Sequence, residues 1–183
     1  MDIMTTYVKV VNLNEETFKQ IKELFENEGP NGAYVDLFKH VNKIYGTEFD
    51  ESNLDRTWMV DNIGVKWFSI EFGHVDYSPE VEFVIESGHN VPTEYLQNLI
   101  NHLTQWDKDI AMYGLYEEEE YKLIGAYVYG YDWDDVEDYD DYDSARMWDD
   151  DDYRDEIMDE LHDHRDSLYE KYLEVKKENE EEN

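Results

Sequence analysis

The sequence predicts an α+β fold: a ferredoxin-like antiparallel sheet with helices on one face, followed by an acidic segment and a C-terminal amphipathic helix. Three observations indicate it. Up to residue 130, apolar residues show strand-like alternation and helix-like spacing in the order β, two helices, β, β, α, β, β. Beyond residue 130 acidic residues become much denser, and apolar residues then recur at helical spacing. We therefore expect a domain at 1–130, an acidic aromatic-rich segment at 131–152, and a helix at 153–183 that frays at its acidic end.

The first half of the domain is predicted to hold one strand and two helices. The sequence TTYVKVVN at 5–12 is typical of a short strand. Asn14 follows as a helix N-cap residue, and Leu13 and Phe18 occupy the positions of a hydrophobic staple around that cap. A second helix is indicated by apolar residues at helical spacing, namely Tyr34, Leu37, Phe38, Val41 and Ile44.

Two strands, a helix and two further strands are predicted to complete the domain. WFSIEFG at 67–73 and EVEFVIES at 80–87 alternate apolar and polar residues, as half-buried strands do. Pro92 can begin a helix. The buried stripe of that helix consists of Leu96, Leu99, Ile100, Leu103 and Trp106. Residues 109–130 then form two strands around an acidic turn at 117–120, and the whole order suggests a split βαβ sheet.

The stretch WMVDNIGVKWFSIEF at 58–72 resembles a signature of the Api92-like (YubB-like) ferredoxin-like proteins of phages and plasmids, in which a Trp precedes an acid-Asn-Trp-Gly-Thr-Lys-Trp run. The matching residues are Trp58, Asp61, Asn62, Gly64, Lys66 and Trp67, while Ile63 and Val65 depart from the pattern. The resemblance covers roughly residues 55–130. It implies the same fold class and a home on mobile genetic elements, which often encode inhibitors of host defence.

The net charge is far larger than solubility requires. The chain has 48 acidic and 15 basic residues, a formal net charge of −33. Residues 1–130 carry −15 and residues 131–183 carry −18, so the charge is concentrated near the C-terminus and not spread evenly as in a salt-adapted protein. Because such a surface repels phosphates and anionic lipids, we expect a basic protein as partner, with no direct nucleic acid or membrane binding.

The compartment predicted from the sequence is the cytoplasm, which would be that of the host cell if a phage encodes the protein. Cysteine is absent, which is typical of a reducing compartment. No apolar run is long enough to span a membrane, and the first residues lack the pattern of a signal peptide.

The sequence offers no convincing catalytic or metal-binding motif. It has no cysteine nucleophile, no G-x-S-x-G elbow, no P-loop and no H-E-x-x-H pair. An EF-hand loop starting at Asp132 would place Val136 where the fifth-position ligand is required. We therefore expect no enzymatic activity, no cofactor and no metal site. The less favoured alternative is an enzyme with a cleft lined by Trp58, Asn62, Lys66 and Trp67.

The acidic segment is dense enough to imitate the charge of a nucleic acid strand. Residues 131–156 hold 14 acidic residues and two Arg, a net charge of −12. As a helix this gives roughly one charge per 3.3 Å, against about 3.4 Å on each DNA strand, and an extended chain has about half that density. The interleaved Tyr and Trp rings can stack on Arg or fill pockets meant for bases. The alternative is a solvated, flexible linker whose rings pack on the domain.

These features predict an acidic inhibitor, of the type carried by phages or mobile elements. It would mimic nucleic acid and block the basic channel of a host defence protein such as a restriction enzyme or a CRISPR effector. The alternative is an acidic chaperone or assembly factor that shields a basic protein. The predicted partner-binding residues are Asp132, Trp133, Asp134, Asp135, Glu137, Asp138, Tyr139, Asp140, Asp141, Tyr142, Asp143, Trp148, Asp149, Asp150, Asp151 and Asp152.

The predicted C-terminal helix carries an apolar stripe that has to be buried. Its residues are Tyr153, Ile157, Leu161, Leu168, Tyr172 and Val175. The stripe can pack on the domain of its own chain or against a second copy of the chain. In the second case the residues of a homodimer interface would be Tyr153, Ile157, Leu161, Leu168 and Tyr172.

Overall fold

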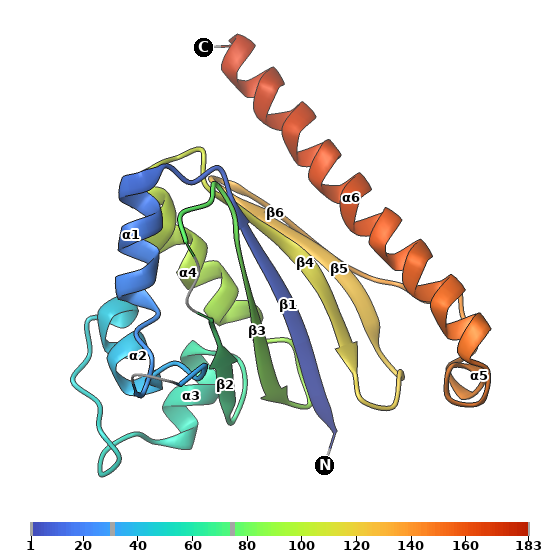
Figure 1. The fold of residues 1–183 in the computed structure, drawn as a ribbon, viewed down its shortest axis with the longest axis horizontal. Coiled ribbons are helices and arrows are strands. Elements are labelled where there is room, and N and C mark those ends of the chain that lie inside the picture. Colours follow the sequence, from blue (N-terminus) through green and yellow to red (C-terminus); the bar gives the residue numbers. More distant parts are fainter. Residues whose placement is uncertain (1, 30–31, 74–75, 183) are drawn as a thin grey trace.

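In the computed structural model, which describes residues 2–29, 32–73 and 76–182, the chain forms one antiparallel sheet with helices on both faces (Figure 1). The strands are β1 (Ile3–Val11), β2 (Phe68–Glu71), β3 (Val81–Gly88), β4 (Ala111–Glu118), β5 (Ile124–Gly130) and β6 (Trp133–Asp138). Their order is β2-β3-β1-β4-β5-β6. The first four strands, with helices after β1 and after β3, have the split βαβ order of the ferredoxin-like fold. The predicted fold class is confirmed.

One face of the sheet is covered by helices from the first part of the chain (Figure 1). These are α1 (Glu15–Leu24), α2 (Leu37–Tyr45), α3 (Arg56–Asn62) and α4 (Thr93–Trp106). Asn14 caps α1 as predicted, since its side chain accepts a hydrogen bond from the Thr17 backbone N at 2.9 Å. The sequence did not predict α3, a short helix that begins after the capping side chain of Asp55.

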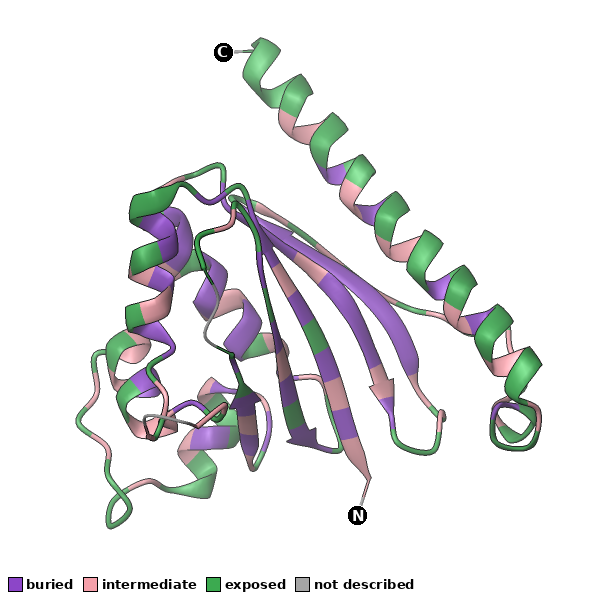
Figure 2. Ribbon diagram, in the orientation of Figure 1, coloured by how far each residue is buried: buried purple, intermediate pink, exposed green. Residues whose placement is uncertain are grey.

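The opposite face is covered by α6 (Asp151–Glu182), which follows the short helix α5 (Ser144–Asp149). The expectation of helices on one face only is therefore incomplete. Ile157, Leu161 and Leu168 form a second core with apolar side chains of β4 and β5, including Leu115 and Val128. Figure 2 shows the buried residues of α6 on the side that faces the sheet. The helix also continues to Glu182, where fraying was predicted.

The apolar stripe of α6 is buried within its own chain. Ile157, Leu161, Leu168 and Tyr172 are each 4% exposed or less, and Tyr153 is half-buried. They pack on the apolar side chains of the sheet in their own chain. Of the two expectations for the stripe, the structure shows packing on its own domain, and a homodimer through Tyr153, Ile157, Leu161, Leu168 and Tyr172 stays a prediction.

Strand β5 is buried on both faces because it lies between the two cores. Ala126 and Val128 contribute to the core under α6, whereas Tyr127 and Tyr129 contribute to the core under the other helices. At the end of β5, Gly130 lets α6 approach closely, since a Cβ there would collide with the ring of Tyr172. The strand therefore consists of apolar residues on both faces, as in a sheet with two covered faces.

His40 is a buried polar side chain between α1, α2 and α4. Its Nδ1 lies 2.8 Å from the Leu24 carbonyl O and its Nε2 lies 2.6 Å from the Tyr95 hydroxyl. Because a carbonyl can only accept, Nδ1 carries the proton and donates to Leu24, and Nε2 accepts from Tyr95. Burial disfavours the charged form and lowers the pKa of His40 to about 4.

We expect His40 to make the fold sensitive to acid. The unfolded chain, with a His pKa near 6.5, takes up this proton at a higher pH than the folded protein. The contribution of neutral His40 to the free energy of unfolding is therefore fully present above pH 6.5. It falls by about 3 kcal/mol as the pH is lowered towards 4. Urea unfolding at several pH values should show a shallower acid loss in His40→Leu than in the wild type.

The control for this prediction is His162→Leu, which removes an exposed histidine of α6. Comparing variants cancels the contribution of the many carboxylates, which titrate in the same pH range. An identical pH dependence in the wild type and in His40→Leu would contradict the assignment of the acid sensitivity to His40.

Candidate partner-binding surface

The acidic segment begins as a strand of the sheet and continues into a loop and the short helix α5. Its first portion is strand β6, which pairs with β5 from Gly130↔Trp133 to Gly125↔Asp138. In the described part of the chain β6 is the last strand at this edge. Charged side chains on an edge strand discourage pairing with other chains, so they also serve the fold. Pairing of β5 with β6 thus joins residues on the two sides of the predicted boundary at residue 130.

The acids of β6 point to both sides of the sheet. Trp133 and Asp135 face α6, where Trp133 packs on the Tyr172 ring at 5.8 Å and Asp135 pairs with Lys171 at 3.6 Å. Asp138 faces the other side and accepts a hydrogen bond from the Tyr116 hydroxyl at 2.5 Å. The predicted site residues 132–138 therefore do not form a single surface.

The rings of the acidic segment mostly attach it to the domain. The Tyr142 hydroxyl donates to the Tyr121 carbonyl O at 2.6 Å, and the Trp148 Nε1 donates to the Glu120 carbonyl O at 3.1 Å. The Tyr139 hydroxyl donates to the Glu160 carboxylate, which raises the pKa of Tyr139 to about 12.

Only some rings of the segment are open to a partner. Trp133, Tyr139 and Tyr142 are half-buried and pack at the rim of the core under α6. For them, packing on the domain is the correct alternative. Trp148 and Tyr131 are 55% and 46% exposed. The Trp148 ring lies edge-on to the Tyr121 ring, with 5.8 Å between the ring centroids.

The acids from residue 139 onwards lie together. The loop 139–143 runs beside the first half of α6, because Tyr139 contacts Glu160 and the Asp143 backbone N donates to the Tyr153 hydroxyl at 2.8 Å. Helix α5 contacts α6 and lies at the N-terminal end of that helix (Figure 1). We call the exposed acids of this region the acidic surface; they are Asp140, Asp141, Asp143, Asp149, Asp151, Asp152, Asp155, Glu156, Asp159, Glu160, Asp163 and Asp166.

The acidic surface extends beyond the residues predicted from the sequence. The predicted site ended at Asp152, although α6 continues with exposed acids at the positions outside its apolar stripe. Residues 151–166 hold eight acids and two Arg, a net charge of −6, or roughly one charge per 4 Å of helix. The same spacing that predicted the helix also determines which of its residues point outwards.

The Arg residues of this region leave most of its charge uncompensated. Arg146 pairs with Asp150 at 3.2 Å, Arg154 with Asp151 at 3.0 Å and Arg165 with Asp166 at 3.0 Å. In each pair one partner is more than half exposed, so the pairs contribute little to stability. Residues 131–166 hold 18 acids and three Arg, a net charge of −15. The surface therefore presents a strong negative potential from a folded scaffold.

A groove of about 530 Å³, which the sequence did not predict, lies between the sheet and α6. Its lining includes Tyr7 and Lys9 of β1, Tyr113 of β4, and Arg165 of α6. Lys9 pairs with Glu82 at 3.5 Å, and the Tyr7 hydroxyl donates to the Glu117 carboxylate at 2.9 Å. Two pairs of polar groups in the groove thus interact with each other, and burial raises the pKa of Tyr7 to about 12.

The residues proposed for the alternative enzyme cleft include two, Trp58 and Asn62, whose side chains contact α3 and the segment before it. Trp58 packs edge-on against the rings of Tyr45 and Phe49, and the Asn62 side chain donates to the Trp58 carbonyl O at 3.0 Å. A small apolar pocket of about 130 Å³ lies next to α3, and its lining includes Met59, Leu37 and Val41. None of Trp58, Asn62, Lys66 and Trp67 lines this pocket. The contacts of Trp58 and Asn62 are those of structural residues.

Comparisons with models of known protein families, with curated proteins and with solved structures gave no match. The resemblance to the Api92-like proteins therefore stays a prediction. Within the described residues, no helix has the length and apolar character needed to cross a membrane.

Proposed function

We propose that the protein is an acidic inhibitor, of the type carried by phages and mobile elements, that mimics nucleic acid. Its acidic surface would occupy the basic DNA- or RNA-binding channel of a host defence protein such as a restriction enzyme or a CRISPR effector. The observation that supports this most is the joining of loop 139–143, α5 and the first half of α6 into one acidic surface. No catalytic residue is assigned, and no cofactor is required.

The charge spacing suits such a channel. Along the first half of α6 the net charge is roughly one per 4 Å, close to the value of about 3.4 Å for one DNA strand. A channel lined with Lys and Arg gains affinity by releasing ions when it binds phosphates, and a row of carboxylates competes for the same cationic groups. The exposed Trp148 ring can stack on an Arg of the channel.

The fixed scaffold adds to the expected affinity. The core under α6 and the hydrogen bonds of Tyr139, Tyr142 and Trp148 hold the acidic surface in place before a partner arrives. A preorganised surface loses less conformational entropy on binding than a disordered acidic tail does. The rings of the acidic segment therefore support binding mainly through position, and only the exposed ones through contact.

We expect the protein to inhibit a nuclease that depends on a basic channel. A purified restriction endonuclease or Cas9-type effector is incubated with the protein and then given its DNA substrate. Cleavage should fall with protein concentration, and excess DNA added first should protect the enzyme, because both ligands need the same cationic groups. Binding without any loss of cleavage would instead support the acidic chaperone, and absence of binding to every basic protein tested would contradict both proposals.

A further inference from the structure

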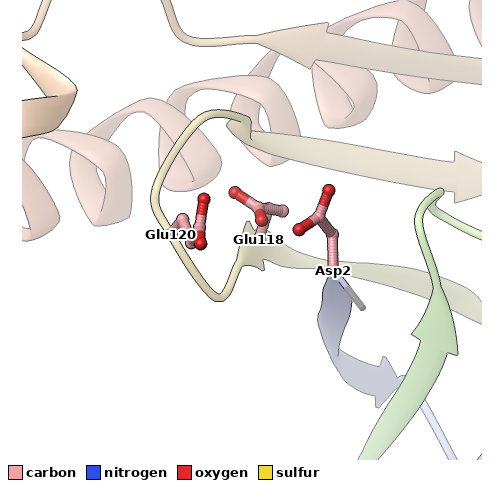
Figure 3. Close-up of side chains that lie close together, drawn as sticks. All are labelled: Asp2, Glu118 and Glu120. Atoms are coloured by element: carbon pink, nitrogen blue, oxygen red, sulfur yellow. The ribbon is translucent and has the colours of Figure 1, made fainter.

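Three carboxylates meet at the turn between β4 and β5, two from the turn itself and one from the start of the chain. They belong to Asp2, Glu118 and Glu120, and one oxygen of each lies within 4.8 Å of the others. Figure 3 shows Glu118 between the other two side chains, with Asp2 at the start of β1. Carboxylates at this distance repel one another unless a positive charge lies near them. The cluster is therefore a place where a cation would be stabilised.

The strand pairing fixes the positions of these residues. Met4 is opposite Glu118 in the antiparallel pair of β1 and β4, and the Glu119 backbone N donates to the Ile3 carbonyl O at 2.9 Å. The turn itself is tight, with Tyr121 in the left-handed region at φ 57°. The backbone thus fixes where the three residues stand, so the closeness of their carboxylates does not depend on flexible side chains alone.

Glu118 supplies an independent indication that a ligand belongs here. The residue is only 4% exposed, although Glu is almost never so deeply buried without a partner. Its Oε2 accepts a hydrogen bond from the Lys122 backbone N at 2.9 Å. Its Oε1 is buried and has no hydrogen-bond partner among the described residues. Burying an unpaired carboxylate oxygen is costly, and a bound cation would compensate for that cost.

We propose that Asp2, Glu118 and Glu120 form a binding site for a hard divalent cation, and that Ca²⁺ fits it best. Carboxylate oxygens are the ligands that Ca²⁺ and Mg²⁺ prefer. With Ca–O distances of about 2.3–2.6 Å, two ligands of one Ca²⁺ can lie about 5 Å apart, whereas Mg²⁺ permits only about 4 Å. Three oxygens within 4.8 Å can therefore reach one Ca²⁺ with little movement. Water molecules would complete its coordination.

Lys122 competes for this site. Its ammonium lies 2.5 Å from the Glu120 carboxylate and is largely exposed. A divalent cation would displace this ammonium, because the exposed Lys122 side chain can move into solvent. The buried Glu118 carboxylate has no such freedom and stays in the site. Removing the ammonium should therefore strengthen cation binding.

The turn is also an attachment point of the acidic segment. The carbonyl oxygens of Glu120 and Tyr121 accept the hydrogen bonds from Trp148 and Tyr142. A cation that orders the turn would thus stabilise the same contacts that position the acidic surface. The cation site does not rest on the inhibitor proposal, and its test needs no partner protein.

Calorimetric titration with CaCl₂ and, separately, MgCl₂ at about 0.15 M KCl tests the proposal, since this salt screens diffuse attraction to the exposed acids. We expect one saturable Ca²⁺ site, a loss of affinity of at least tenfold in Glu118→Gln, and a gain in Lys122→Met. The matched control is Glu119→Gln, which removes the same charge from an exposed residue of the same turn. Thermal unfolding should show a Ca²⁺-dependent rise in Tm that Glu118→Gln loses.

Several outcomes would overturn the proposal. Equal effects of Glu118→Gln and Glu119→Gln on Ca²⁺ affinity would mean that cations gather around the exposed acids of the protein in general, without a built site. Many weak, unsaturable sites would mean the same. Tighter binding of Mg²⁺ than of Ca²⁺ would contradict the choice of cation. If Glu118→Gln does not fold, Asp2→Asn and Glu120→Gln, which change less buried residues, give the same comparison.

Discussion

Neutralising the acidic surface is expected to reduce binding to the target channel by two to three orders of magnitude, if each of seven exposed charges contributes roughly 0.5 kcal/mol. The variant replaces seven exposed aspartates by Asn, which keeps their size; they are Asp140, Asp141, Asp149, Asp152, Asp155, Asp159 and Asp163. Asp143 and Asp150 are left unchanged because their side chains accept hydrogen bonds from backbone N–H groups at the starts of α5 and α6. Affinity is measured by anisotropy with the purified nuclease.

A matched variant separates this surface from the overall charge of the protein. It neutralises seven exposed acids outside the acidic surface, namely Glu16, Glu23, Glu48, Glu51, Asp61, Asp76 and Glu80. Its affinity should fall much less, because only long-range attraction changes. Both variants should remain folded, and relief of repulsion should leave their stability equal to or above that of the wild type. Equal losses of affinity in the two variants would show that net charge, and no particular surface, governs binding.

Leu161→Ala is expected to lower the free energy of unfolding by about 2–5 kcal/mol. Leu161 is fully buried in the core between α6 and the sheet, so its removal leaves a cavity in the element that carries the acidic surface. The control is Leu173→Ala on the same helix, where the side chain is 42% exposed and the loss should stay below about 1 kcal/mol. Urea unfolding measures both.

The same pair of variants tests how the stripe of α6 is buried. Because Leu161 packs within its own chain, Leu161→Ala should change the stability but leave the sedimentation mass unaltered. A loss of stability no larger than that of Leu173→Ala would contradict the packing of α6 on the sheet. A sedimentation mass that is half as large in Leu161→Ala as in the wild type would instead support a homodimer interface through the stripe.

Apolar spacing predicted most of the fold, because a half-buried strand and an amphipathic helix each bury one set of side chains. This holds for the alternating residues of β3 and for Ile157, Leu161 and Leu168 of α6. Strand β6 was missed because Asp is unfavourable in strands and Trp133 and Val136 lie on opposite faces. Its formation depends on the free edge of β5, which no local pattern reveals.

The candidate sites were only partly accessible to the sequence. Acid density indicated the region of the acidic surface, but not which rings face a partner, because Tyr142 and Trp148 look alike until their burial is known. The acidic turn at 117–120 was visible, whereas its approach to Asp2 follows from the register of β1 and β4. The unpaired oxygen of Glu118 is a property of the packed protein alone.

The most direct test of nucleic acid mimicry is an equilibrium competition between this protein and a short labelled duplex for a purified Cas9-type effector or restriction endonuclease, repeated over a range of salt concentrations. If the acidic surface substitutes for phosphates, the protein displaces the duplex competitively, and its own affinity falls steeply as salt rises. A complex in which protein and duplex are bound at the same time, with an affinity that salt does not change, would contradict the mimicry.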